Sequence, residues 1–278
     1  MSSSTFAILS NSAPLGHESF AAHRELESLL KKSVRGEVRF DSGSRALYAA
    51  DASNYRQLPI GVIFPRDAAD VEATLAACRA TDAAVLPRGA GTSLAGQCVN
   101  VAVVIDYSRY MNALASIDPE ARLARVEPGI VLDRLRDAAE LHQLTYAPDP
   151  ATHSRCTLGG MIGNNSCGVH GLLGGKVVDN VESLDVVLYD GTRMTVGATP
   201  PERLEALIRE GGPCRANLFG PRAHPRSLRS AGPRKISSHS SPRLRLQPRR
   251  AASREQFSMS HARWSALREP ALTLSPPR

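Results

Sequence analysis

The sequence changes character abruptly near Gly212, and this change limits the part of the chain that can fold around a core. From Arg215 onward the chain holds 13 Arg and one Lys against two Glu, a formal charge of +12, whereas residues 1–214 carry −5. The same 64 residues contain eight Pro and eleven Ser, and they show no sustained hydrophobic period of two or 3.6. We therefore predict that residues 213–278 form an unstructured, basic C-terminal tail.

The preceding residues alternate short apolar runs with turns, as expected of an α+β domain. We place a flexible leader at residues 1–17 and the folded domain at residues 18–212. Asp67 is predicted to cap a helix, and Asp190-Gly191 between two strands predicts a hairpin. The predicted strands are 60–64, 84–87, 101–105, 122–126, 181–188 and 193–196, and the predicted helices are 18–32, 67–81, 130–141 and 201–209.

Several classes of protein are excluded by the sequence. The leader lacks the basic segment and the apolar core of a signal peptide, and no window approaches the roughly 20 apolar residues of a membrane-spanning helix. The five cysteines are widely spaced and form no C-x-x-C pair, which argues against a disulfide framework, a zinc site or an iron–sulfur cluster. We expect a soluble, cytoplasmic protein with reduced cysteines and no metal.

Two glycine-rich segments carry the strongest chemical signal. The first, Pro87–Gln97, follows a predicted strand, and its backbone N–H groups can converge on an anion. It matches neither a Walker A loop nor the dinucleotide fingerprint, so an ordinary tight turn remains the alternative interpretation. The second, Thr157–Gly168, lies about sixty residues later and combines glycines with small hydrogen-bonding side chains. Together the two segments favour a long ligand that carries two phosphates.

The order and spacing of these motifs resemble a known family, the FAD-binding domain of the vanillyl-alcohol oxidase / p-cresol methylhydroxylase (PCMH) flavoproteins. The run Asn164–His170 is most similar to FAD-linked D-2-hydroxyacid dehydrogenases of the D-lactate, glycolate and 2-hydroxyglutarate type. The resemblance covers roughly residues 40–210 and implies a PCMH-type domain built from two small α/β subdomains. The motifs are Arg88–Ser93 with Gln97, Val126–Gly129, Pro148–Pro150, Thr157–Gly160, Asn164–Gly168 and Val181–Gly191.

The resemblance also implies where the cofactor lies. The backbone amides that would wrap the FAD pyrophosphate belong to Arg88, Gly89, Ala90, Gly91, Thr92 and Ser93, with Gln97 close by. The rest of the trough would be lined by Pro148, Thr157, Gly159, Gly160, Asn164 and Gly168, with Val181 near the adenine end. Thr92 stands where relatives with covalent flavin often carry the linking His, so we predict non-covalent FAD. Gly174-Gly175 departs from the Tyr-Gly of many relatives and leaves the flavin contact there unassigned.

No catalytic residue is assigned. His153 and His170 lie beside glycine-rich segments, where a hydrogen-bonding role is more common than a place at a reaction centre. Asp149 stands between prolines, which suits a rigid turn. The resemblance implies oxidation of a 2-hydroxyacid by hydride transfer to flavin N5 and reoxidation by an unknown electron acceptor. The groups that hold the substrate would belong to a cap domain that should begin where the sequence changes character.

Three interpretations account for the tail. A frameshift near residues 212–219 would leave the flavin half without its cap domain, and turnover by such a chain is not expected. A catalytically inactive flavin-binding remnant is the second interpretation. The third is a nonspecific nucleic-acid binder, since basic residues neutralise phosphates. Aromatic residues that could stack on bases are nearly absent from the tail (Phe219, Phe257 and Trp264), so nucleic acid is the least favoured partner.

Overall fold

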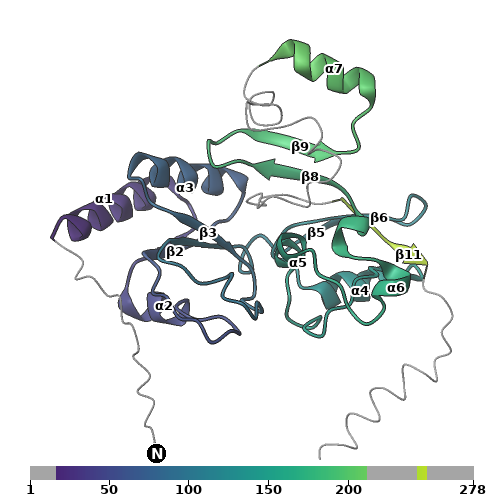
Figure 1. Cartoon of the computed structure of the whole chain (residues 1–278), viewed down its shortest axis with the longest axis horizontal. Coiled ribbons are helices and arrows are strands. Elements are labelled where there is room, and N and C mark those ends of the chain that lie inside the picture. The colour runs from purple at the N-terminus through teal and green to yellow at the C-terminus, as the bar shows by residue number, and fades with distance from the viewer. Residues whose placement is uncertain (1–16, 212–242, 249–278) are drawn as a thin grey trace, which may run out of the picture.

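The computed structural model describes residues 17–211 and 243–248, which form two main sheets with helices packed beside them (Figure 1). The helices are α1 (His17–Ser33), α2 (Ser42–Leu47), α3 (Ala68–Ala80), α4 (Leu132–Glu140), α5 (Leu158–Asn164), α6 (Gly171–Gly174), the 3₁₀ helix η1 (Val177–Asn180) and α7 (Pro201–Glu210). The strands are β1 (Glu37–Arg39), β2 (Gly61–Phe64), β3 (Val85–Arg88), β4 (Val103–Asp106), β5 (Leu114–Asp118), β6 (Leu123–Val126), β7 (Leu144–Thr145), β8 (Val181–Val187), β9 (Arg193–Gly197), β10 (Arg243–Arg245) and β11 (Gln247–Pro248).

The first sheet has the strand order β1-β2-β4-β3, in which β2, β4 and β3 run parallel and β1 runs antiparallel to β2. Every residue of β2 and β4 is buried, as expected of parallel strands covered on both faces. Helices α1 and α3 contribute Leu26, Leu30 and Cys78 to a core shared with Ile63 and Val103. The carboxyl ends of the parallel strands share one edge, and the first glycine-rich segment leaves the sheet there, after β3.

The second sheet is antiparallel throughout, with the strand order β5-β6-β10-β8-β9. Its core is shared with α4 and α5 and is filled by Leu132, Leu135, Leu158 and Met161. The predicted β8–β9 hairpin is confirmed, and Gly191 takes the left-handed φ of +88° that its turn requires. These two sheets, each with its own core, confirm the predicted α+β class and its two subdomains.

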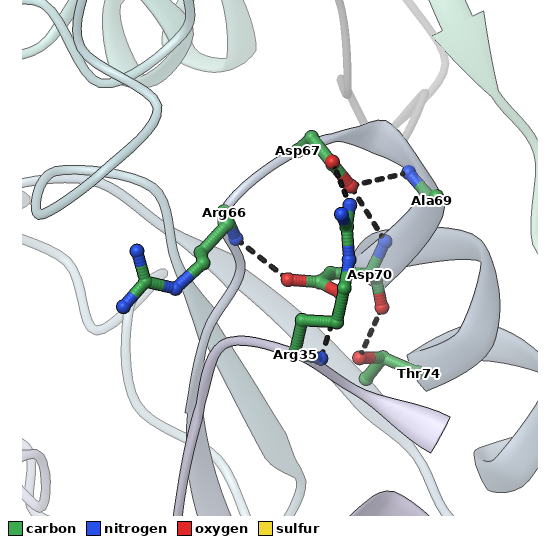
Figure 2. A network of polar contacts seen from close by, with 6 residues as sticks. All are labelled: Arg35, Arg66, Asp67, Ala69, Asp70 and Thr74. Atoms are coloured by element: carbon green, nitrogen blue, oxygen red, sulfur yellow. Dashed lines mark hydrogen bonds and ion pairs between the residues drawn. The ribbon is translucent and has the colours of Figure 1, made fainter.

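The start of α3 is tied to the segment that follows α1 (Figure 2). The Asp67 carboxylate accepts the N–H groups of Ala69 and Asp70 at 3.0 and 3.1 Å, which confirms the predicted cap. The Asp70 side chain is buried and accepts the N–H groups of Arg35 and Arg66 at 2.9 and 2.8 Å. This buried carboxylate therefore joins three points of the chain with charge-assisted hydrogen bonds.

Helix α3 also connects the two subdomains. Arg79 donates to the carbonyl of Tyr189 at 2.7 Å, and Glu72 lies 3.1 Å from the guanidinium of Arg193. A third core contains Val71 and Leu75 of α3, Ile105 of β4 and Val187 of β8. The hairpin of the second sheet is thus packed against the first subdomain.

The prediction of an unstructured tail is wrong for residues 243–248. Strand β10 lies between β6 and β8 and pairs antiparallel with both, and β11 pairs with β7. Leu244 and Leu246 are buried in the second core, whereas Arg245 is exposed and pairs with Glu182. This alternation of buried Leu with exposed Arg is too short to stand out in the sequence among the surrounding Arg, Ser and Pro residues. The predictions for residues 1–16, 212–242 and 249–278 lie outside the described residues.

The remaining differences from the predicted elements are local. Most predicted helices and strands are found within one or two residues of their expected ends. Helix α2 and strands β1, β5 and β7 were not predicted, since each is short. Helix α5 forms inside the second glycine-rich segment although glycine disfavours a helix, and Gly159 packs closely against Pro128 there.

Candidate cofactor site

The two glycine-rich segments lie against each other, although they belong to different subdomains. Gly89 in the first segment faces Thr157 in the second, and a Cβ atom added to Gly89 would lie 2.0 Å from the Thr157 hydroxyl oxygen. Further along, the side-chain nitrogen Nδ2 of Asn164 lies 3.5 Å from the Ser93 hydroxyl, at the limit of a hydrogen bond. The tertiary structure therefore places the two predicted halves of one site side by side.

The first segment presents a run of unpaired backbone donors. Within the described part of the chain, none of the six consecutive N–H groups from Gly89 to Leu94 donates a hydrogen bond. Gly91 holds the left-handed φ of +69°, which turns the chain within this run. Successive N–H groups around such a turn form a concave site for an anion. Ala90 and Leu94 are exposed, whereas Gly89, Gly91, Thr92 and Ser93 are buried or half-buried, and such donors are rare in proteins unless a ligand or water binds them.

Arg88 differs from the residues that follow it, because its side chain points into the protein. The side chain is 9% exposed and donates to the carbonyl oxygens of Tyr48, Ala50 and Cys98 at 3.3, 2.8 and 2.8 Å. Its guanidinium carbon also lies 5.0 Å from the centre of the Tyr48 ring. The Arg88 guanidinium is thus occupied by protein groups beneath the loop.

The second segment begins with Thr157, which precedes α5 and is buried. The N–H of Gly159 donates to the carbonyl of Pro128 at 2.8 Å, and a Cβ on Gly159 would lie 2.9 Å from that residue. Only glycine permits this approach of α5 to the turn before α4. Gly160 and Asn164 are exposed on the same short helix and are available to a ligand.

A third segment, residues 146–150, lies beside Gly168 at the end of the second glycine-rich segment. Arg136 of α4 donates to the carbonyls of Tyr146 at 3.1 Å and Pro148 at 3.2 Å. Burial lowers the pKa of Arg136, although the nearby Asp149 and Asp133 carboxylates act in the opposite direction. Arg136 therefore supports this segment much as Arg88 supports the first loop.

Gly168 and His170 pack onto the same segment. A Cβ on Gly168 would lie 2.1 Å from the carbonyl oxygen of Asp149. The Asp149 carboxylate accepts the backbone N–H of His170 at 3.2 Å and also contacts its ring Nδ1. The ring Nδ1 of His153 pairs with the carboxylate of Asp133, at 2.8 Å. These contacts give both histidines a local hydrogen-bonding role.

Gln97 and Val181 lie differently from the other predicted residues. The Gln97 side-chain oxygen accepts the N–H of Ala95 at 3.2 Å and so closes its own turn. Val181 pairs with Leu244 in the sheet and packs against the second core. The end of the first loop also lines an open pocket of about 180 Å³, formed by Tyr55, Arg56, Gln57, Ala95, Gly96 and Val99.

Within residues 17–211 and 243–248, no group of three His, Cys, Asp or Glu side chains is placed to hold a metal ion. Cys78 and Cys156 are buried, Cys98 is half-buried and Cys167 is exposed, and each is a free thiol. Among the described helices, none is long and apolar enough to cross a membrane.

Comparison with known protein families matches residues 59–197, half of the chain, to the FAD binding domain family. The chain belongs to this family. The matched region contains both glycine-rich segments and the Pro148–Pro150 turn, so the family's cofactor, FAD, agrees with the predicted one. Strand β10, by contrast, lies beyond the matched residues although it completes the second sheet.

Curated relatives of the chain carry names of 2-hydroxyacid enzymes. It is 39% identical over 172 residues to D-2-hydroxyglutarate dehydrogenase of Pseudomonas putida, an alignment that covers 61% of this chain and 17% of that protein. It is 36% identical over 148 residues to glycolate oxidase subunit GlcD of Escherichia coli, covering 52% of this chain and 30% of that subunit. The chain therefore spans less than a third of either relative.

Solved structures share the fold at low sequence identity. BBE-like 1 of Physcomitrella patens matches with a TM-score of 0.61 and 19% identity, over 80% of this chain and 44% of that one. Alkyldihydroxyacetonephosphate synthase matches with a TM-score of 0.58 and 18% identity, over 82% and 43% of the two chains. These similarities confirm the predicted PCMH-type architecture.

Sequence reasoning did not identify the residues that support the site from behind. Arg136 and Asp51 lie in segments with no motif. The carbonyl partners of Arg136 come ten and twelve residues later in the chain, and Cys98, a partner of Asp51, comes 47 residues later. The prolines beside Asp149 were the one available signal for a rigid segment. Asp51 becomes visible only because its carboxylate accepts the N–H of Cys98 at 3.3 Å.

Proposed function

We propose that this chain is the FAD-binding part of a flavin-dependent oxidoreductase that oxidises a 2-hydroxyacid. One observation carries the proposal: the loop in which six consecutive N–H groups, Gly89–Leu94, have no partner among the described residues lies against a second glycine-rich segment, so closely that a Cβ on Gly89 would clash with Thr157. Such a run of backbone donors suits the negative charge of a pyrophosphate. The relatives named as 2-hydroxyacid enzymes supply the substrate class.

The residues fit FAD in distinct roles. The N–H groups of the first loop bind the pyrophosphate oxygens, and Thr157, Gly159, Gly160 and Asn164 form the facing wall. Pro148 and Gly168 extend that wall along the segment that Arg136 and Asp149 hold in place. When bound, FAD supplies the acceptor for the hydride that leaves the substrate. Gln97 lies close to the pyrophosphate, and Val181 approaches the adenine end of the cofactor.

We propose further that the flavin is held without a covalent bond. Thr92, at the position of the linking His, has no ring nitrogen that could attach to a flavin. A chain loaded with FAD should therefore lose all flavin absorbance after acid precipitation and washing. Flavin absorbance that stays with the precipitated chain would contradict non-covalent binding.

The binding test compares three ligands on the purified full chain. FAD and ADP share the diphosphate and should both bind, with ADP competing against FAD, whereas riboflavin lacks phosphates and should bind much more weakly. Fluorescence quenching of the flavins and calorimetry with ADP provide the measurements. Equal affinity for FAD and riboflavin would contradict the role of the backbone donors, and absence of FAD binding would contradict the proposed function.

A glycine pair tests the same run of donors by substitution. Gly91→Ala places a Cβ 2.5 Å from the Arg88 guanidinium at a φ of +69°, so FAD affinity should fall at least about tenfold. Gly43→Ala in the exposed helix α2 meets only the Asp41 side chain at 3.4 Å and should leave FAD affinity unchanged. Equal affinities for the two variants would show that the shape of the first loop is not required.

A further inference from the structure

The side chain of Arg88 joins the two ends of the loop that carries the N–H groups of Gly89–Leu94. Arg88 stands at its first residue, and its Nη1 donates to the carbonyl of Cys98 at the far end, at 2.8 Å. The same guanidinium reaches back to the carbonyls of Tyr48 and Ala50. One planar group thus connects both ends of the loop to a neighbouring segment, residues 48–51.

Asp51 in the neighbouring segment completes the connection. Its carboxylate accepts the N–H of Cys98 at 3.3 Å and the N–H of Ser53 at 2.8 Å. Burial acts to raise the pKa of Asp51, but the bonds from Ser53 and Cys98 and the charge of Arg88 outweigh it and leave the pKa below its usual value. Asp51 is therefore a carboxylate at neutral pH and complements the buried Arg88 cation.

The turn of the loop lies directly over the guanidinium. The carbonyl of Gly91 accepts the N–H of Ala52 at 3.0 Å, and the position of a Gly91 Cβ is only 2.5 Å from Arg88 Nη2. Arg88, Asp51 and the carbonyl of Gly91 all bind on the inner side of the loop. Among residues 17–211 and 243–248, the N–H groups of Gly89–Leu94 have no partner.

We propose that Arg88 is a positioning residue: its side chain binds no phosphate and instead fixes the loop so that its N–H groups are arranged for a diphosphate before the ligand arrives. This inference rests on the proposed FAD function. It adds a separate role for the Arg88 side chain, which supports the loop, while the backbone N–H groups bind the ligand. A loop held in its bound shape loses little conformational entropy on binding, which raises affinity. A phosphate-binding arginine would need a free guanidinium, and Arg88 has three carbonyl partners.

The test uses Arg88→Lys in the full chain, because lysine keeps the charge but lacks the planar fork that reaches several carbonyls at once. FAD and ADP affinities should fall about tenfold or more, while the weak affinity for riboflavin stays unchanged. Arg66→Lys is the matched control, since Arg66 follows the parallel strand β2, is exposed and has its guanidinium over the Tyr110 ring. The control should bind FAD like the wild type.

Hydrogen exchange supplies a measurement that does not depend on FAD. The N–H groups of Ala52 and Cys98 bind across the loop and should be protected in the wild type and lose protection in Arg88→Lys. If Arg88→Lys does not fold, Asp51→Asn removes one partner of the connection and should show a smaller loss of the same kind.

The outcomes separate the two proposals. A wild-type chain that binds neither FAD nor ADP overturns the proposed function, and the inference falls with it. A wild type that binds FAD together with an Arg88→Lys variant of equal affinity overturns only the positioning role. Loss of riboflavin affinity in parallel with FAD affinity would also overturn it, because the effect would then not be confined to the diphosphate.

Discussion

Two buried polar side chains, Asp70 and Tyr146, show how differently single residues are accommodated in this fold. Both are 1% exposed or less. Asp70 accepts two backbone N–H groups, so its burial is compensated (Figure 2). The hydroxyl of Tyr146 has no hydrogen-bond partner among the described residues, and burial raises its pKa well above the usual value. A buried polar group without a partner costs stability, whereas a paired one contributes to it.

Asp70→Ala should therefore lower the free energy of unfolding by about 2–4 kcal/mol, because it removes two partly buried, charge-assisted hydrogen bonds from the N–H groups of Arg35 and Arg66. Asp67→Ala, three residues earlier, removes the helix cap and an exposed ion pair with Arg35, and should cost about 1 kcal/mol. Urea unfolding of both variants measures the difference. A larger loss for Asp67→Ala would contradict this assignment.

Tyr146→Phe should leave stability unchanged or raise it by up to about 1 kcal/mol, since it removes a buried hydroxyl without a partner and keeps the ring. Thermal unfolding of the variant beside the wild type is the measurement. A loss of more than about 1 kcal/mol would show that the hydroxyl is bound in solution, for example by a buried water.

At the scale of secondary structure, β10 has the greatest consequence. It fills the position between β6 and β8, so without it each of these strands would have an unpaired edge. The side chain of Leu244 is fully buried in the core that α4 and α5 share. The segment that holds this strand must therefore accompany residues 17–211 for the second subdomain to be complete.

Leu244→Asp should destabilise the chain by at least about 3 kcal/mol, because it buries a carboxylate that has no partner in an apolar core. Leu141→Asp serves as the control, since Leu141 is 83% exposed at the end of α4 and the same change there should cost little. Denaturant unfolding distinguishes the two. Equal stability of both variants would mean that β10 does not occupy the sheet in solution.

At the scale of the whole molecule, several carboxylates make the fold more stable at neutral pH than at acidic pH. Hydrogen bonds from Tyr110 and Arg39 lower the pKa of Glu37, and the N–H of Ser44 lowers that of Asp41. A carboxylate whose pKa is lower in the folded state stabilises the fold above its unfolded pKa, and this contribution disappears as the pH falls.

Thermal unfolding in low salt should therefore show a constant midpoint from pH 7 to about 5 and a falling midpoint below about pH 4, where these carboxylates become protonated. Glu37→Gln should flatten this decline, because it removes one of the titrating groups. A midpoint that stays level down to pH 3 would contradict the contribution of these pairs.

Much of the fold could be predicted from the sequence, because many of its elements are determined by residues close together in the chain. The apolar runs that form β2, β4 and β8, the cap at Asp67 and the turn at Asp190-Gly191 depend on neighbouring residues, so their patterns are readable in one dimension. The glycine-rich motifs likewise indicated the family that the comparisons show. Short elements such as β1 and α2 were missed because a few residues carry too little periodicity.

The tertiary structure alone decided how the site is supported and which tail residues fold. The inward direction of Arg88 and the facing positions of Gly89 and Thr157 depend on contacts between segments distant in sequence. Residues 243–248 look like the rest of a basic tail, yet Leu244 and Leu246 become buried because a vacant position exists between β6 and β8. Composition describes a segment in isolation, whereas burial depends on the surface that the rest of the chain offers it.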